Sequence, residues 1–434
     1  MAGALASYGQ ALELYRQVGD RLGEANVLWA IGDVQQFRAD MAGALASYGQ
    51  ALELYRQVGD RLGEANVLKA IGDVQQFRAD MAGALASYGQ ALDLFRQVGD
   101  RLGEANVLKA IGDVQQFRDD RAGALASYGQ ALDLFRQVGS RLGEANVLKA
   151  IGDVQQFRDD RAGALASYGQ ALELFRQVGS RQGEANVLKA IGDVQQFRKE
   201  MAGALASYGQ ALELYRQVGA RLGEANVLQA MGNASRAEKQ YAEAKSLYEN
   251  SLALYQAVGA QQGEANSYLE MARLALMQED AGQAQQYARQ AVERHTAIGS
   301  SYNAALDYET LAAACRAAGD LAAAMEALGQ AAARYTEIGL TEQAASARTA
   351  LADVIEQAGR TEEALALSAA IIESAPDETW LRRNYAEKLI KLKQLDEAAA
   401  QLDIAEAQEP ASPYLALRRA ELAQAREQRA EAQT

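Results

Sequence analysis

The sequence predicts an all-α fold, a right-handed α-solenoid (superhelix) of stacked antiparallel helix pairs. A 40-residue unit recurs almost letter for letter through the first 240 of the 434 residues. Within each unit, the apolar residues recur at the spacing of two amphipathic helices. A helix pair this short cannot bury both apolar faces alone, so neighbouring units must stack and share a continuous core.

The unit at residues 61–100 begins with a first helix, which we expect at residues 63–79. Its apolar residues are spaced by one and then by three, which places them on one face of a helix. These residues are Val67, Leu68, Ile71, Val74 and Phe77. We therefore expect this face to be packed.

The second helix of the unit is expected at residues 81–98. Asp80 is a good N-cap residue, and Gly99 stands where a left-handed helix terminator belongs. Asp100 then offers a carboxylate to the next first helix. The apolar face of the second helix consists of Met81, Ala84, Leu85, Tyr88, Ala91, Leu92, Phe95 and Val98.

Three glycines lie inside these helices, at Gly72, Gly83 and Gly89. Each costs about 1 kcal/mol relative to alanine, so the local sequence does not explain them. Close backbone packing is the expected compensation, first of all at Gly72.

The run Ile71, Gly72, Ala84, Tyr88, Ala91 and Leu92 resembles the tetratricopeptide repeat, in which a Leu-Gly pair marks the first helix and Ala, aromatic and Ala mark the second. The family repeat has about 34 residues. The 40-residue unit is similar to the extended repeats of bacterial transcriptional activators and signalling ATPases. Gln75 replaces the aromatic residue usual on the first helix, with Phe77 two residues on. The resemblance implies that the first helices line a concave groove.

The repeat pattern divides the chain into four parts. Residues 1–240 hold six near-identical units that start at a second helix, and residues 241–360 hold three divergent 40-residue units. Residues 361–410 hold shorter units of the 34-residue type, and residues 411–434 are expected to form a C-terminal capping helix. The near-identical units start at Met1, Met41, Met81, Arg121, Arg161 and Met201.

The charge, the hydropathy and the cysteine content of the chain limit the classes of partner that we expect. The chain has 43 Lys and Arg against 57 Asp and Glu, a net charge of −14, which disfavours nucleic acid. No apolar run approaches the roughly 18 residues that span a bilayer, so no membrane partner is expected. The one cysteine, Cys315, excludes an internal disulfide and fits a reducing compartment, so we expect a cytoplasmic protein.

The residues give no sign of an enzyme. The six near-identical units contain no histidine or cysteine, and His295 and Cys315 both fall at packing positions. No glycine-rich phosphate loop opens a helix, so we expect no nucleotide, cofactor or metal.

The candidate binding surface is a polar stripe on the first helices, with lysine and aspartate four residues apart. The family's peptide-carboxylate clamps pair a matching lysine with asparagine, whereas an aspartate stands here. The alternative to a binding role is that each lysine and aspartate form a solvated i,i+4 ion pair on the helix surface. The lysine position varies, to Trp29 in the first unit and Gln229 in the sixth. The stripe consists of Asn66, Lys69, Asp73, Gln76, Asn106, Lys109, Asp113, Gln116, Asn146, Lys149, Asp153, Asn186, Lys189 and Asp193.

These observations favour a non-catalytic scaffold that binds a protein or peptide segment in its groove. One alternative is a self-assembling homo-oligomer or filament, formed through Leu5, Tyr8, Leu12 and Tyr15 of a second helix that lacks its own partner. Another alternative is the sensor or linker portion of a larger signalling protein, whose catalytic domain would lie outside this sequence.

Overall fold

The computed structural model describes residues 2–410 and 412–431, and these residues form helices and short turns without any strand. Met1, where the first repeat starts, and residues 411 and 432–434 of the expected capping segment lie outside the described residues. The chain divides into two compact units, residues 1–220 and 221–434. None of the helices within the described part is both long and apolar enough to cross a membrane.

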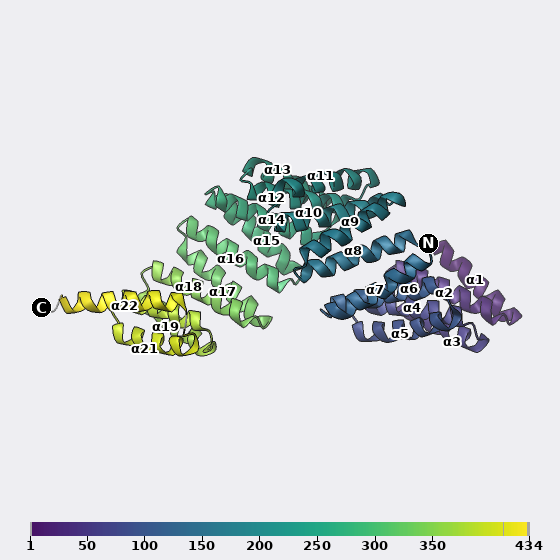
Figure 1. The fold of residues 1–434 in the computed structure, drawn as a ribbon, viewed down its shortest axis with the longest axis horizontal. Coiled ribbons are helices and arrows are strands. Elements are labelled where there is room, and N and C mark those ends of the chain that lie inside the picture. The colour runs from purple at the N-terminus through teal and green to yellow at the C-terminus, as the bar shows by residue number, and fades with distance from the viewer. Residues whose placement is uncertain (1, 411, 432–434) are drawn as a thin grey trace. The chain divides into compact units, whose positions relative to one another are not determined.

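The first unit contains eleven of the described helices, coloured from purple to teal in Figure 1. They are α1 (Ala2–Val18), α2 (Arg21–Phe37), α3 (Met41–Val58), α4 (Arg61–Phe77), α5 (Met81–Val98), α6 (Arg101–Phe117), α7 (Arg121–Gln137), α8 (Arg141–Phe157), α9 (Arg161–Gln177), α10 (Arg181–Phe197) and α11 (Met201–Val218).

The second unit contains the other eleven. They are α12 (Arg221–Ala237), α13 (Tyr241–Val258), α14 (Gln261–Met277), α15 (Ala281–Ala297), α16 (Ser301–Ala317), α17 (Leu321–Glu337), α18 (Thr341–Gln357), α19 (Thr361–Ser374), α20 (Thr379–Lys391), α21 (Leu395–Gln408) and α22 (Pro413–Glu431).

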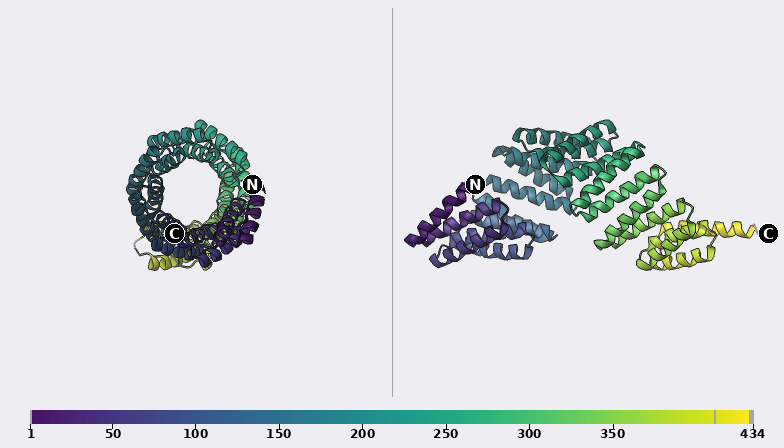
Figure 2. Two further views of the ribbon diagram at one scale, coloured as in Figure 1. Left: turned by 90° about the vertical axis from the view of Figure 1, so that its right-hand side faces the viewer. Right: turned by 180° about the vertical axis from the view of Figure 1, so that it is seen from behind.

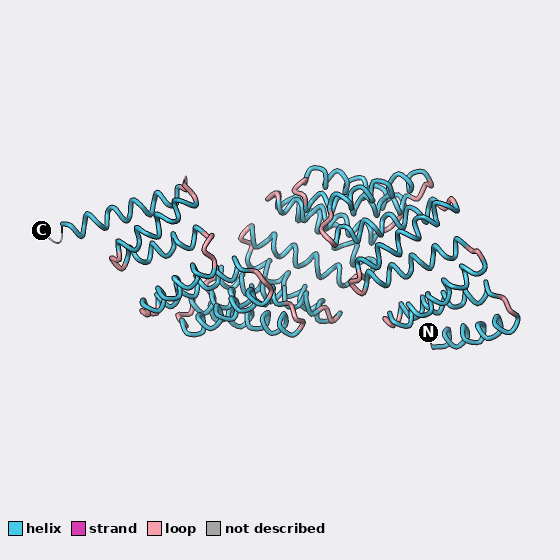
Figure 3. The backbone as a smooth tube through the Cα atoms, turned by 90° about the horizontal axis from the view of Figure 1, so that it is seen from below, coloured by secondary structure: helices cyan, strands magenta, loops and turns pink. Residues whose placement is uncertain are grey.

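Within each unit, consecutive helices are antiparallel neighbours, as the two views of Figure 2 show. In the first unit, α4 packs on α5, on the preceding α3 and more lightly on α6, the next first helix. Loops of two to four residues join the helices (Figure 3). These tandem helix pairs confirm the predicted α-solenoid.

The turns follow the predicted capping chemistry. Asp80 Oδ1 accepts a hydrogen bond from the Gly83 amide at 2.9 Å, and Gly99 ends α5 with φ of +76°. Asp100 caps α6 in the same way. However, α4 begins and ends two residues earlier than predicted, because Asp60 caps it and Ala79 adopts φ of +61°.

Two of the three helical glycines have a packing role. A Cβ atom at Gly72 would lie 2.5 Å from Cε1 of Tyr88, so the glycine lets this buried ring approach the backbone of α4. A Cβ atom at Gly83 would lie 2.2 Å from the capping Asp80 carboxylate. Gly89 has no atom within 4 Å of such a position, so packing explains Gly72 and Gly83 but not Gly89.

The expectation that Phe77 belongs to the packed face is wrong, because its side chain is 71% exposed. Phe77 is the last residue of α4, and the chain turns away there before α5 begins. The periodicity places its ring on the correct side of the helix, but beyond the reach of the neighbouring helices. In contrast, Cys315 and His295 are buried, as predicted.

Candidate protein-binding groove

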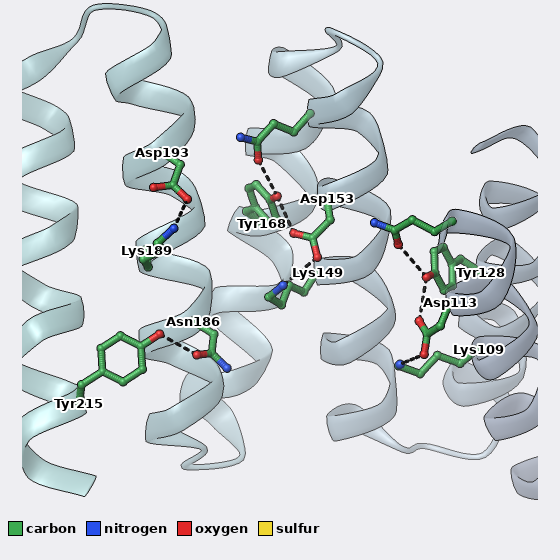
Figure 4. A network of polar contacts seen from close by, with 12 residues as sticks. Lys109, Asp113, Tyr128, Lys149, Asp153, Tyr168, Asn186, Lys189, Asp193 and Tyr215 are labelled. Atoms are coloured by element: carbon green, nitrogen blue, oxygen red, sulfur yellow. Dashed lines mark hydrogen bonds and ion pairs between the residues drawn. The ribbon is translucent and has the colours of Figure 1, made fainter. Parts of the chain in front are cut away.

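The polar stripe on the first helices α4, α6, α8 and α10 is built from ion pairs. Nζ of Lys69 lies 2.7 Å from Oδ2 of Asp73, one helical turn away, and each of the two side chains is 33% exposed. The same 2.7 Å contact recurs at Lys109, Lys149 and Lys189. Figure 4 shows three of these pairs on successive first helices.

A buried tyrosine of the following second helix fixes each of these aspartates. The Tyr88 hydroxyl donates to Oδ1 of Asp73 at 2.8 Å and also lies 3.0 Å from Oε1 of Gln76. Burial raises the pKa of Tyr88 above its usual range, and the charge of Asp73 raises it further. The tyrosine therefore stays a donor, and both oxygens of the aspartate are bound. These contacts hold the side chains of the stripe in place.

This arrangement determines what the lysines can do. Each ammonium has three N–H donors, and the aspartate engages only one side of it. The pair is close to neutral overall, so the stripe presents directed donors rather than a strong positive field.

The asparagines of the stripe fall into two classes. Asn186 accepts a hydrogen bond from the Tyr215 hydroxyl at 2.7 Å, and Asn26 accepts one from Tyr55 at 2.6 Å. In the three 40-residue repeats between them, phenylalanine replaces this tyrosine, at Phe95, Phe135 and Phe175. The amides of Asn66, Asn106 and Asn146 have no hydrogen-bond partner among the described residues. Three consecutive units therefore present an unengaged amide beside each ion pair.

The lysine row ends differently at its two ends, one of which lies in the first compact unit, residues 1–220, and the other in the second, residues 221–434. In the first unit, Trp29 replaces the lysine and packs against the core, while Asp33 still accepts from Tyr48 at 2.6 Å. In the second unit, Gln229 and Asn233 replace lysine and aspartate together, and Tyr248 donates to Asn233 at 2.7 Å. The positive and the negative charge therefore disappear together at this position.

A second row of ion pairs was not anticipated from the sequence. Nε of Arg56 lies 2.8 Å from Oε1 of Glu64, a buried residue in the first turn of α4, where the helix dipole favours a carboxylate. The contact recurs at Arg16, Arg96, Arg136 and Arg176. The constant eight-residue spacing of arginine and glutamate is the signal for it. These pairs join neighbouring repeats and include no residue of the polar stripe.

The second unit contains a charged cavity of about 530 Å³ that the sequence did not indicate. The ammonium of Lys388 is buried there, 2.5 Å from Asp353 and 2.6 Å from Glu356. Burial alone would lower the pKa of Lys388, but the two carboxylates raise it, so the lysine stays charged. The cavity is lined by Arg316, Asp353, Glu356, Gln357, Asn384, Glu387, Lys388 and Lys391.

Comparison with known proteins gives one family. One tetratricopeptide repeat model matches five segments, residues 1–57, 63–137, 104–177, 143–217 and 222–297, and a second model of the same description matches residues 356–422. A search of curated proteins finds no match.

Solved structures share the fold at low sequence identity. The chain is 17% identical to the apo form of the quorum sensor NprR from B. thuringiensis, with a TM-score of 0.53 over 83% of this chain and 99% of that chain. A signal transduction ATPase with numerous domains and a tetratricopeptide repeat sensor, from Pyrococcus horikoshii, gives 15% identity and a TM-score of 0.58 over 80% of this chain and 53% of that one. The apo form of RapI gives 16% identity and a TM-score of 0.53 over 64% of this chain and 99% of that chain. The repeated model matches, which cover more than half of the chain, show that it belongs to the tetratricopeptide repeat family.

Proposed function

We propose that the chain is a non-catalytic scaffold that binds a protein or peptide segment along the polar stripe of α4, α6, α8 and α10. One observation carries the proposal: three consecutive units present an unengaged asparagine amide next to a fixed lysine. An amide offers both donors and an acceptor, which is what the main chain of an extended segment requires. We propose a cytoplasmic location, because a chain with one cysteine, Cys315, fits a reducing compartment.

The small energy of each contact favours a binding surface that extends over several repeats. A partly exposed i,i+4 ion pair contributes only a few tenths of a kcal/mol to the fold. The lysines are therefore not needed for stability, and each contact to a partner is weak as well. Affinity comes from repetition along several units, because a segment that is held by one unit is already positioned at the next.

The test is a triple variant, Asn66→Ala with Asn106→Ala and Asn146→Ala, used as bait in a lysate beside the unmutated chain. Proteins that the unmutated chain retains should be lost from the variant, while its circular dichroism stays helical. Gln90→Ala with Gln130→Ala is the matched control, since both glutamines are exposed on second helices. Equal retention by the triple variant and the control would contradict the proposed site.

Self-assembly is a second candidate function, favoured by the exposure of α1. Leu14 is 61% and Tyr15 36% exposed, whereas Leu54 and Tyr55 at the same positions of α3 are buried. This uncovered surface is the one on which we expect Leu5, Tyr8, Leu12 and Tyr15 to mediate self-association.

A further inference from the structure

Five phenylalanines form an exposed row at one edge of the first unit. Each is the last residue of a first helix, and their side chains are between 67% and 74% exposed. Single exposed apolar residues are ordinary, but five in the same register at one edge form a patch that marks an interaction surface. We call this row, Phe37, Phe77, Phe117, Phe157 and Phe197, the phenylalanine rim.

The rim is hollowed between two of its rings. A cavity of about 370 Å³ lies between Phe117 and Phe157, with the buried Val154 and the side chain of Arg121 in its lining. Gln116 and two carboxylates also line it, Asp113, which is paired with Lys109, and Asp119, which is paired with Arg121. The Arg121 guanidinium lies 5.8 Å from the centre of the Phe157 ring, and that of Arg161 lies 3.8 Å from the Phe197 ring. The space between the Phe117 and Phe157 rings can therefore receive one large apolar side chain.

The rim also carries available positive charge. An arginine follows each phenylalanine. Within the described residues, no side-chain partner contacts four of these arginines, Arg38, Arg78, Arg118 and Arg158. The fifth, Arg198, pairs with Glu200.

The carboxylates in the same turns are already engaged. Asp40, Asp80, Asp120 and Asp160 each accept a backbone amide at 2.9 Å as helix caps. Asp119 and Asp159 pair with Arg121 and Arg161. A chain with a net charge of −14 thus offers unpaired arginines beside exposed rings at this edge.

We propose that the phenylalanine rim binds an extended acidic segment that carries a large apolar side chain at every third residue. Neighbouring first helices lie on the order of 10 Å apart, and an extended segment in the polyproline II conformation advances about 3.1 Å per residue and points every third side chain to the same side. Every third side chain then reaches the space between successive rings, and the acidic residues between them meet the arginines. The proposal goes beyond groove binding, because the phenylalanines and arginines that carry it do not belong to the polar stripe, although Asp113 and Gln116 of the stripe also line the cavity between Phe117 and Phe157.

The test uses the full chain and fluorescein-labelled peptides made of Glu-Leu-Asp triplets, with Lys-Leu-Arg triplets as the basic counterpart. Fluorescence anisotropy should detect binding of the acidic peptide alone. Phe117→Gln with Phe157→Gln should weaken it about tenfold or more, because both walls of one apolar site are lost. Arg118→Gln with Arg158→Gln should weaken it and reduce its salt dependence.

The chain supplies a matched control for the lost apolar surface. Leu102 and Leu142 are half-exposed at the other end of α6 and α8, and the next unit already has glutamine there, at Gln182. Leu102→Gln with Leu142→Gln should leave the affinity unchanged. Equal weakening by both pairs, or equal binding of the basic peptide, would overturn the proposal.

Two further outcomes would assign the rim to another occupant. Tighter binding of a single-stranded oligothymidylate than of the acidic peptide would make the rings and arginines a nucleic-acid surface. A smaller particle size of the phenylalanine variant alone, measured by light scattering, would make the occupant a second copy of the chain. Either result would exclude an acidic segment as the main partner.

Discussion

Nδ1 of His295 lies 2.5 Å from Oδ2 of Asp307, at two positions where the near-identical repeats hold Phe95 and Val107. Both side chains of the polar pair are fully buried. Nε2 of His295 also lies 3.1 Å from Oδ1 of Asn266. Burial raises the pKa of Asp307, although the contact with His295 opposes this shift. An apolar packing pair in the repeats has therefore become a buried polar pair in the second unit.

The two residues should behave as one unit in a double-mutant cycle. His295→Phe or Asp307→Val alone should lower the stability by about 3–5 kcal/mol, because each leaves a buried polar group without its partner. The double variant restores the apolar pair of the other repeats and should recover most of the loss. Urea unfolding followed by circular dichroism measures all three variants. Additive effects of the single changes would show that the residues are not coupled.

Substitution of alanine for two of the helical glycines should change the stability of the chain in opposite directions. A Cβ atom at Gly112 would lie 2.5 Å from Cε1 of Tyr128, whereas Gly129 has open space. Gly112→Ala should therefore cost about 1–3 kcal/mol through overpacking. Gly129→Ala should gain up to about 1 kcal/mol of helix propensity. Thermal melts of the two variants test the pair. A stabilised Gly112→Ala chain would contradict the close approach of Tyr128.

The sequence predicted what repeats locally and missed what depends on contacts between helices. The Lys69–Asp73 pair follows from i,i+4 spacing, and Gly72 from its cost within a helix. The hydrogen bond from Tyr88 to Asp73 joins α5 to α4, and the unengaged amide of Asn66 depends on Phe95, 29 positions later. Phe77 was misplaced because periodicity gives the side of a helix but not where the neighbouring helix ends.

Stability should fall steeply in alkali. Burial raises the pKa of Tyr55, Tyr215 and Tyr255 to about 12. Tyrosine in the unfolded chain ionises near pH 10, so between about pH 10 and 12 the folded state binds more protons than the unfolded state. Each of these residues then loses a contribution of about 2–3 kcal/mol as the pH rises through this window, while stability below pH 10 is unaffected by them.

Tyrosinate absorbance near 295 nm and helical circular dichroism should therefore change together above pH 10. Tyr55→Phe removes one of the titrating groups and should shift the transition to higher pH. Full ionisation of the tyrosines with the helical signal intact would contradict their coupling to the fold.

A further helix placed before α1 should stabilise the first unit. Tyr15 is partly exposed, whereas Tyr55 at the same position is buried and donates to Asn26 on the first helix of its own repeat. A copy of residues 61–80 placed before Met1 continues the repeat and sets an asparagine 29 residues before Tyr15. Burial of the uncovered leucine and tyrosine should then add about 1–3 kcal/mol, seen as a higher unfolding midpoint.

The same addition should also lower any self-association, because it covers the surface proposed to mediate it. Leu5→Glu with Leu12→Glu should likewise disperse oligomers, although with some loss of stability in the first repeat. Light scattering over a concentration series measures the particle size in both cases. A concentration-independent monomer that neither change affects would rule out α1 as a self-association surface, whereas a higher midpoint from the added helix would still establish that this face accepts a first helix. The two readouts thus separate the packing of α1 from its role in assembly.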